Sequence, residues 1–238
     1  MGKYALIFAA GMGRRMMPLT ADKPKPMVEV FGKPMIGHIL DHLQRAGIEN
    51  IVVNAHYKAD VLKNYLETRK DLNIKISYED DILDTGGGIA YAKNMLPQDE
   101  AFFVINGDAY WDAAEDFVLP DLASTWHDDM DILLLLQDKC DVREGAGDYM
   151  FTQNQRIERC LDQNGDYMFT GIRIVHPRIL NDLPIEKFSF LKCMDEAQHN
   201  GTLYGFKNKG LWHHLSTPQD IEALEQIKKQ TKQQQNHG

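Results

Sequence analysis

The sequence contains few cysteines, no long apolar run and no excess of basic residues. Its three cysteines, Cys140, Cys160 and Cys193, lie far apart and form no Cys-x-x-Cys pair, which argues against a zinc knuckle or a disulfide framework and favours the reducing cytoplasm. No apolar stretch approaches the roughly twenty residues that span a bilayer, and the run at residues 4–8 is too short for the core of a signal peptide. We therefore expect a cytoplasmic protein that is neither exported nor bound to a membrane.

The charge balance is acidic, with 26 Lys and Arg against 35 Asp and Glu and a formal net charge of −9. Nucleic-acid binding relies on a net basic surface, so DNA and RNA are poor candidates for the partner. The 238 residues, 43% hydrophobic, suffice for one large α/β domain. We expect a single domain over residues 1–227 and a disordered polar tail over residues 228–238, which are rich in Lys and Gln.

Apolar runs alternate with helix-period segments through the first half of the chain. Strands are predicted at residues 4–8, 51–53, 74–78 and 102–105. Helices are predicted at residues 35–43, 61–66 and 89–95. This alternation is typical of a doubly wound parallel sheet with helices on both faces.

The second half of the chain is less regular. Strands are predicted at residues 132–136, 169–175 and 203–206, with a short hairpin from 149–152 and 156–160. Helices are predicted at residues 188–197 and 219–227. The whole order predicts an α/β fold with a doubly wound, mixed but mainly parallel sheet and small antiparallel additions in the C-terminal half.

The most informative segment follows the first predicted strand. There the chain runs through the glycine-containing loop 9–13 and then adds Arg14, Arg15, Lys23 and Lys25. A parallel strand ends at a ligand crevice, and glycines let backbone amides approach a phosphate closely. A surface turn with solvated charges is the alternative. The cations favour a site for a polyphosphate.

A second polar segment, Asn106-Gly107-Asp108, directly follows the apolar strand at residues 102–105. Parallel strands end at the same edge of a sheet, so we expect Asp108 to lie on the side of the glycine loop. A carboxylate there can hold Mg²⁺, which prefers hard oxygen ligands and bridges phosphates. An Asx turn after the strand is the alternative.

Three consecutive glycines lie within the segment Leu83-Asp-Thr-Gly-Gly-Gly-Ile89. They can let flat backbone lie against a ring or a phosphate at a helix start, or merely form a tight loop between a strand and a helix. The preceding Glu79 accepts hydrogen bonds at neutral pH, so it can pair with a ring N–H of a nucleobase.

A segment with an aromatic residue and two histidines, 210–218, precedes the last predicted helix. Trp212 can stack on a sugar or fill the core. His213 and His214 point to opposite faces if the segment is a strand, so at most one of them faces a site. His56 has the same two interpretations, a site residue or a hydrogen-bonded structural residue.

Together these segments resemble the signature of the sugar-1-phosphate nucleotidyltransferases. The resemblance rests on residues 9–20 and Pro24-Lys-Pro26. It continues over nearly the whole chain through Gly32-Lys-Pro34, Asp84-Thr-Gly-Gly-Gly88, Val104-Ile-Asn-Gly-Asp108, Phe169-Thr-Gly-Ile172 and residues 212–218. Within this family the chain looks most like the N-acetylmuramate-1-phosphate uridylyltransferases of bacterial cell-wall recycling, which are similar to mannose-1-phosphate guanylyltransferases.

The resemblance implies a Rossmann-like nucleotidyltransferase fold, Mg²⁺ as cofactor, and a monomer or homodimer that makes a nucleotide sugar and pyrophosphate from a nucleoside triphosphate and a sugar 1-phosphate. Arg14 would neutralise the leaving phosphates, Lys25 would bridge the nucleotide and sugar phosphates, and Asp108 would hold the metal. The nucleotide side would include Ala9, Ala10, Gly11, Gly13, Glu79, Thr85, Gly86 and Gly87. The sugar-phosphate side would include Asn106, Gly147, Thr170, Gly171 and Trp212.

The sequence departs from this family in two places. Many members have an aspartate as second metal ligand where this chain has His214, and neutral imidazole is a poorer Mg²⁺ ligand than carboxylate. A second lysine before the Thr-Gly strand is also absent. Three readings stay open: transfer of UMP to N-acetylmuramate 1-phosphate, transfer of GMP to mannose 1-phosphate, and non-catalytic binding of a nucleotide sugar. A dinucleotide-dependent dehydrogenase is disfavoured because Asn54 stands where a ribose-binding acid is needed.

Overall fold

A computed structural model describes residues 3–112, 115–139 and 147–235, with side chains described up to residue 229. Its main sheet has the strand order β10-β9-β11-β6-β1-β4-β5, and β8 and β12 extend it from β11. The four N-terminal strands of this sheet are parallel to one another: β1 (Tyr4–Phe8), β4 (Asn50–Ala55), β5 (Asn73–Tyr78) and β6 (Phe102–Asn106).

The C-terminal strands mix directions. Strand β11 (Tyr167–Val175) is antiparallel to β6 and to β8 (Ile132–Asp138), and β12 (Leu203–Lys207) is parallel to β8. The hairpin predicted from the sequence is present as β9 (Tyr149–Phe151) and β10 (Ile157–Arg159). The mixed α/β fold with antiparallel additions is therefore confirmed.

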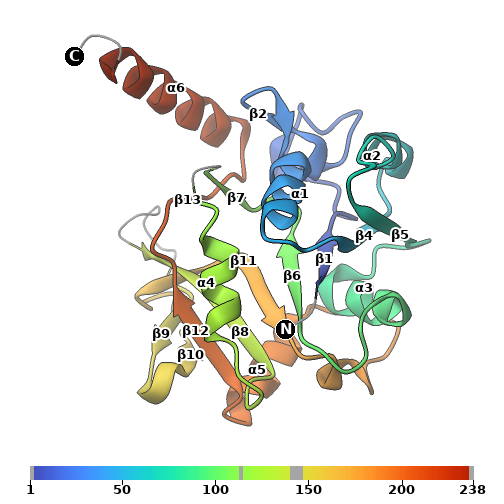
Figure 1. The fold of residues 1–238 in the computed structure, drawn as a ribbon, viewed down its shortest axis with the longest axis vertical. Helices are drawn as coiled ribbons and strands as arrows, with labels where there is room; N and C mark the ends of the chain where they lie inside the picture. Colours follow the sequence, from blue (N-terminus) through green and yellow to red (C-terminus); the bar gives the residue numbers. More distant parts are fainter. Residues whose placement is uncertain (1–2, 113–114, 140–146, 236–238) are drawn as a thin grey trace.

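Helices cover both faces of the sheet (Figure 1). Helices α1 (Met35–Arg45), α2 (Ala59–Leu66) and α4 (Val118–Thr125) contribute to one apolar core. Helices α3 (Asp84–Ala92) and α5 (Leu191–His199) contribute to the core on the opposite face. Successive residues of β1 alternate between these cores, as the two-residue repeat of a strand requires.

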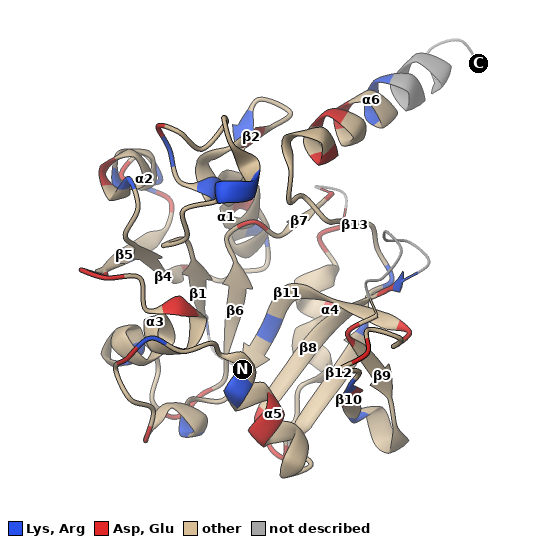
Figure 2. Ribbon diagram, turned by 180° about the vertical axis from the view of Figure 1, so that it is seen from behind, with Lys and Arg blue, Asp and Glu red and all other residues tan. Residues whose placement is uncertain are grey.

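Two short strand pairs lie outside the main sheet. Strand β2 (Glu29–Val30) pairs with β3 (Lys33–Pro34), and β7 (Tyr110–Trp111) pairs with β13 (Trp212–His213). None of the helices in the described ranges is both long and apolar enough to cross a bilayer. Much of the charge lies on helices and loops, and one blue segment stands inside the otherwise uncharged strand β11 (Figure 2).

The last helix, α6, runs from Pro218 to Gln235 and projects from the body of the molecule (Figure 1). Ile221 and Leu224 bury its first turns against a third core. The sequence predicted that this helix ends at Ile227 and that a disordered tail follows; that prediction is wrong for residues 228–235, which continue the helix. Lys and Gln are good helix formers, so the helix extends past its last apolar contact. Residues 236–238 lie outside the described part of the chain.

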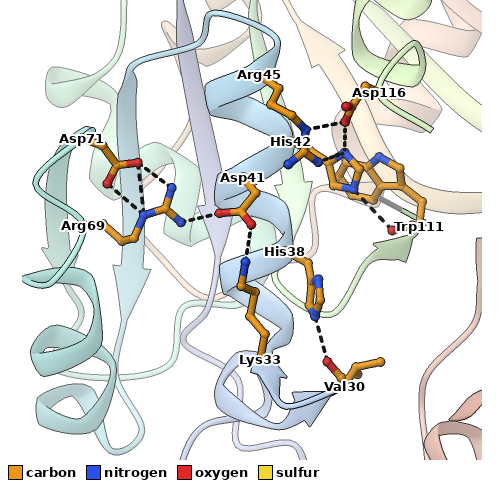
Figure 3. A network of polar contacts seen from close by, with 10 residues as sticks. All are labelled: Val30, Lys33, His38, Asp41, His42, Arg45, Arg69, Asp71, Trp111 and Asp116. Atoms are coloured by element: carbon orange, nitrogen blue, oxygen red, sulfur yellow. Dashed lines mark hydrogen bonds and ion pairs between the residues drawn. The ribbon is translucent and has the colours of Figure 1, made fainter. Parts of the chain in front are cut away.

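A polar network joins α1 to its neighbours (Figure 3). Asp41 of α1 forms ion pairs with Lys33 and Arg69. His42, one residue later, is buried and stacks on Trp111 with ring centroids 4.3 Å apart. Arg45 forms an ion pair with Asp116 and donates to Nδ1 of His42 at 3.2 Å. The same Nδ1 also lies 3.2 Å from Oδ1 of Asp116, and Nε2 lies 3.3 Å from the carbonyl oxygen of Trp111.

This histidine makes stability depend on pH. Burial first, and Arg45 second, lower the pKa of His42 to about 4 from an unfolded value of 6.5. Between these values the unfolded chain binds the proton and the folded chain does not, so His42 makes folding less favourable as the pH falls from 6.5 to 4, by about 3 kcal/mol in all. The free energy of unfolding can be measured in urea at pH 7 and at pH 4. Between these pH values His42→Gln is expected to lose about 3 kcal/mol less of this free energy than the parent protein loses. Equal losses would contradict a lowered pKa of His42 in the folded protein.

Candidate active site

The carboxyl ends of β1, β4 and β6 open onto a cavity of about 330 Å³, called the first cavity. Its floor is formed by Phe8, Asn54 and residues 106–108 at the ends of these strands, and its walls by the glycine loop and the start of α3. The sequence-predicted residues on its lining are Ala9, Ala10, Gly11, Gly13, Lys25, Glu79, Thr85, Asn106 and Asp108. The predicted meeting of the glycine loop with Asp108 at one sheet edge is therefore confirmed.

Lys25 and Asp108 form an ion pair inside this cavity. The Nζ of Lys25 donates to Oδ2 of Asp108 at 2.6 Å; the lysine side chain is 12% exposed and the carboxylate 39%. Gly13 makes this approach possible, because its φ is +63° and a Cβ there would lie 2.7 Å from Cβ of Lys25. Only glycine adopts such a conformation without strain. The pair thus places a cation and a carboxylate side by side on the lining of the first cavity.

A buried chain of hydrogen bonds fixes the glycine loop. The Oδ1 of Asn54 accepts from the backbone amides of Ala9 at 2.6 Å and Ala10 at 3.3 Å. The Nδ2 of Asn54 donates to Oε1 of Glu79 at 2.6 Å, and the amide of Leu83 donates to Oε2 at 3.1 Å. Burial raises the pKa of Glu79. The two loop amides predicted to face nucleotide are therefore already engaged, and Glu79 orients the loop through Asn54.

Asn54 was missed as a site residue, and its effect on stability can be measured. Asn54→Ala is expected to cost about 2–3 kcal/mol, because two loop amides and a carboxylate lose buried partners. Asn73→Ala removes an exposed amide that donates to Asn50, so it is a matched control with an expected loss below about 0.5 kcal/mol. Urea unfolding of both variants measures the difference. Similar losses would show that the buried chain of hydrogen bonds is not stabilising.

The three glycines of α3 are not among the residues that line the first cavity. A Cβ on Gly86 would lie 2.3 Å from the ring of Phe188, and one on Gly87 would lie 2.0 Å from the carbonyl oxygen of Glu186. Gly86 and Gly87 let α3 pack closely against residues 186–188, whereas a Cβ on Gly88 would lie 2.8 Å from Nδ2 of Asn54 and 2.8 Å from Oε1 of Glu79. The neighbouring Lys187 lines the first cavity and adds a cation that the sequence did not predict.

The residues around Asp108 suit Mg²⁺ as a partly hydrated ion. Asn106 and Asp108 offer hard oxygen atoms, and Oδ1 of Asn106 is buried without a hydrogen-bond partner among the described residues. Those residues contain no group of three or more His, Cys, Asp or Glu side chains that could enclose a metal. Mg²⁺ typically binds through one or two carboxylates, phosphates and water, so this donor set fits it.

His214 lies close enough to these groups for their charges to act on it. Burial, followed by Lys25, lowers the pKa of its ring, and Asp108 and Arg15 also act on it. It lines neither of the cavities described here. A neutral ring beside two cations suits a hydrogen bond to a phosphate oxygen at least as well as a metal contact.

A second cavity of about 410 Å³ adjoins the first, and the two share Thr85 and Asn106. Asp148 lines it, and its Oδ2 accepts from the amide of Phe169 at 3.0 Å. Burial raises the pKa of this carboxyl. Arg173 of β11 also lines this cavity. The sequence did not predict either residue, although a charge inside the apolar strand at 169–175 is a visible signal.

The remaining predicted residues support the cavities or lie outside them. Thr170 is buried and donates to the carbonyl of Leu135, and Gly171, with a φ of +83°, lets Asn106 approach closely. Gly147 packs against the backbone of Gly165. Trp212 belongs to an apolar core and lines neither cavity, which favours the core alternative for this side chain.

Arg14 lies on the exposed side of the glycine loop, where its Nη2 contacts the sulfur of Met12 at 3.6 Å. It lines neither cavity. An exposed guanidinium on a long side chain has the freedom to turn toward the neighbouring cavity. Its predicted role therefore stays a prediction.

Comparisons with known proteins identify the family. The nucleotidyl transferase family model matches residues 4–133. The chain is 35% identical over 233 residues to an N-acetylmuramate alpha-1-phosphate uridylyltransferase of Caulobacter vibrioides, and the match covers 94% of this chain and 96% of that protein. It is 31% identical over 229 residues to a mannose-1-phosphate guanyltransferase of Aspergillus oryzae, covering 91% of this chain but 62% of that protein, so it spans less than two thirds of this second relative.

A solved structure agrees with these matches. HddC from Yersinia pseudotuberculosis, crystallised in complex with GMP-PN, has a TM-score of 0.72 and 25% sequence identity, covering 92% of this chain and 96% of that one. The family model spans more than half of the 238 residues, and the Caulobacter relative matches nearly end to end. The chain therefore belongs to the nucleotidyl transferase family, among the sugar-1-phosphate nucleotidyltransferases, as the sequence motifs predicted.

Proposed function

We propose that this protein transfers UMP from UTP to N-acetylmuramate 1-phosphate and releases pyrophosphate, in the recycling of bacterial cell-wall sugars. The observation that carries the proposal is the Lys25–Asp108 pair at 2.6 Å, which joins a cation and a carboxylate at the carboxyl ends of the parallel strands. The match with the Caulobacter uridylyltransferase over nearly the full length of both chains supports this choice of substrates.

The reaction needs alignment and charge neutralisation more than covalent catalysis. A phosphate oxygen of the sugar 1-phosphate attacks the α-phosphorus of the triphosphate, the bond to the β-phosphate oxygen breaks, and pyrophosphate leaves. Lys25, already next to Asp108, can donate to oxygens of both reacting phosphates and hold them in line. Arg14 and Lys187 supply positive charge for the leaving group, Arg14 from the loop edge and Lys187 from the cavity wall.

Asp108, with Asn106 beside it, would hold Mg²⁺. When bound, this ion would neutralise the phosphate charge that develops during transfer. Glu79 and Asn54 line the first cavity, and each carboxylate oxygen of Glu79 accepts one hydrogen bond and keeps a further lone pair for a ring N–H. Uracil and guanine both offer such a donor, so these residues alone do not choose the base.

The substrates can be tested by pyrophosphate release from a matrix of UTP, GTP, CTP and dTTP against muramyl, glucosaminyl, mannosyl and glucosyl 1-phosphates. We expect UTP with N-acetylmuramate 1-phosphate to give the highest kcat/KM. A more than tenfold preference for GTP with mannose 1-phosphate would replace this substrate pair by that of the Aspergillus relative. No pyrophosphate from any pair, together with tight binding of a nucleotide sugar in calorimetry, would indicate a binding protein instead.

A further inference from the structure

Arg173 is a cation buried inside strand β11. Its residue is 3% exposed, and its Nε and Nη2 atoms are buried with no hydrogen-bond partner among the described residues. Within the described part of the chain no carboxylate forms an ion pair with it. Its guanidinium carbon instead lies 5.3 Å, 5.4 Å and 4.8 Å from the ring centroids of Phe8, Phe169 and Phe190.

Such an arrangement is unfavourable in the free protein. Burial lowers the pKa of Arg173 to about 10, which still leaves the side chain protonated at neutral pH. Aromatic faces compensate a buried cation only in part, and unmet guanidinium donors are costly. Buried groups of this kind that lack partners are typical of binding sites whose ligand brings the missing charge.

The position of Arg173 indicates which part of a ligand it meets. It lines the second cavity with Asp148, Arg159 and Phe190, and this cavity shares Thr85 and Asn106 with the first. Arg159 already pairs with Asp195 at 3.0 Å. A sugar whose phosphate lies beside Lys25 can thus extend its ring substituents toward the guanidinium of Arg173.

The two unmet nitrogens indicate the chemistry of the substituent. Nε and Nη2 lie side by side on one edge of the guanidinium, and their parallel N–H bonds match the two oxygens of a carboxylate. We propose that Arg173 binds a carboxylate carried on the sugar ring and thereby selects a sugar acid over neutral sugars, an inference that rests on the nucleotidyl transfer proposed above. N-acetylmuramate carries such a carboxylate on its lactyl ether, whereas mannose, glucose and N-acetylglucosamine carry none.

The test compares three ligands that differ at this group: N-acetylmuramate 1-phosphate, its lactyl amide, and N-acetylglucosamine 1-phosphate, which lacks the lactyl ether. In the unmodified protein we expect calorimetry to show about 100-fold tighter binding of the acid than of the amide. With UTP present, kcat/KM should follow the same order. Arg173→Met should raise KM for the acid about 100-fold and leave kcat/KM for N-acetylglucosamine 1-phosphate within about threefold.

Two further variants separate recognition from folding. Arg173→Lys keeps the positive charge but lacks the two parallel N–H donors of the guanidinium, so it should retain part of the preference for the acid over the amide. Arg156→Met removes an arginine that also lies over an aromatic ring, 5.2 Å from that of Tyr204, but lines neither cavity, and the preference should persist. The amide comparison needs no variant and therefore holds even if Arg173→Met does not fold.

Failure of this inference is distinguishable from failure of the proposed function. Equal binding of acid and amide, or an equal loss for both sugars in Arg173→Met, would overturn carboxylate recognition even in an active enzyme. Selective binding of the acid without pyrophosphate release from any pair would overturn the transferase proposal and leave carboxylate recognition standing.

Discussion

Replacing Asp108 by asparagine is expected to lower kcat/KM by about 10³-fold. The amide keeps the shape of the side chain but removes the charge that pairs with Lys25 at 2.6 Å and that a Mg²⁺ ion requires. Among the described residues no metal-binding group of three acidic, histidine or cysteine side chains exists to take over. Steady-state pyrophosphate release over a Mg²⁺ titration measures both effects, and we expect the half-saturating Mg²⁺ concentration to rise at least about tenfold.

Asp116, which pairs with Arg45 of α1, provides a matched control. Asp116→Asn makes the same chemical change in a carboxylate that pairs with Arg45 at 2.6 Å but lines neither cavity, so kcat/KM should stay within about twofold. Lys25→Met should lower kcat without raising the Mg²⁺ requirement, because Lys25 acts on phosphates and not on the metal. Asp108 would not be the metal ligand if its asparagine variant kept more than about a tenth of the parental kcat/KM at ordinary Mg²⁺ concentrations.

The sequence predicts best the part of the site around Lys25 and Asp108. The glycine loop and Asp108 each follow a short apolar strand, and parallel strands present their carboxyl ends at one edge. Local pattern and one topological rule therefore suffice to bring Lys25 and Asp108 together. The same reasoning finds β1, β4, β5 and β6 with small errors at their ends.

Helix boundaries are predicted less well where tertiary packing opposes local propensity. Helix α3 begins at Asp84, although three glycines in its first turns disfavour a helix. Contact of Gly86 and Gly87 with residues 186–188, which are distant in sequence, stabilises these turns of the helix. Helix α4 was missed because it is short and contains Pro120, which a first helical turn tolerates.

The second cavity could not be predicted, because its residues come from segments far apart in sequence. Asp148, Phe190 and Arg173 meet through the pairing of β11 with β6 and the docking of α5 on the sheet. Residue type alone also left two roles open in one case: Trp212 near two histidines fits contact with a sugar or a place in the core, and its pairing opposite Trp111 favours the core. An aromatic side chain fits either role, and only packing decides between them.

Gly87→Ala is expected to destabilise the protein by about 3 kcal/mol or more. In an unconstrained helix this change would stabilise by about 1 kcal/mol, since alanine is the better helix former. Here the new Cβ would lie 2.0 Å from the carbonyl oxygen of Glu186, a backbone atom that cannot rotate away. Relief requires α3 and the 186–188 segment to separate, which would also move Thr85 and Lys187 on the cavity wall. We therefore expect a higher KM for the nucleotide together with the lost stability.

Gly37→Ala provides the control, because Gly37 is also a helix residue with a close neighbour. There the new Cβ would meet the hydroxyl of Tyr65 at 2.2 Å, the far end of a side chain that can move. The higher helix propensity of alanine then offsets much of the steric cost of this contact. The change in the free energy of unfolding should therefore stay within about 1 kcal/mol. Urea unfolding and nucleotide KM of both variants measure the contrast. A Gly87→Ala protein as stable as the parent would mean that α3 does not pack on residue 186 in solution, and the cavity wall built on that contact would be incorrect.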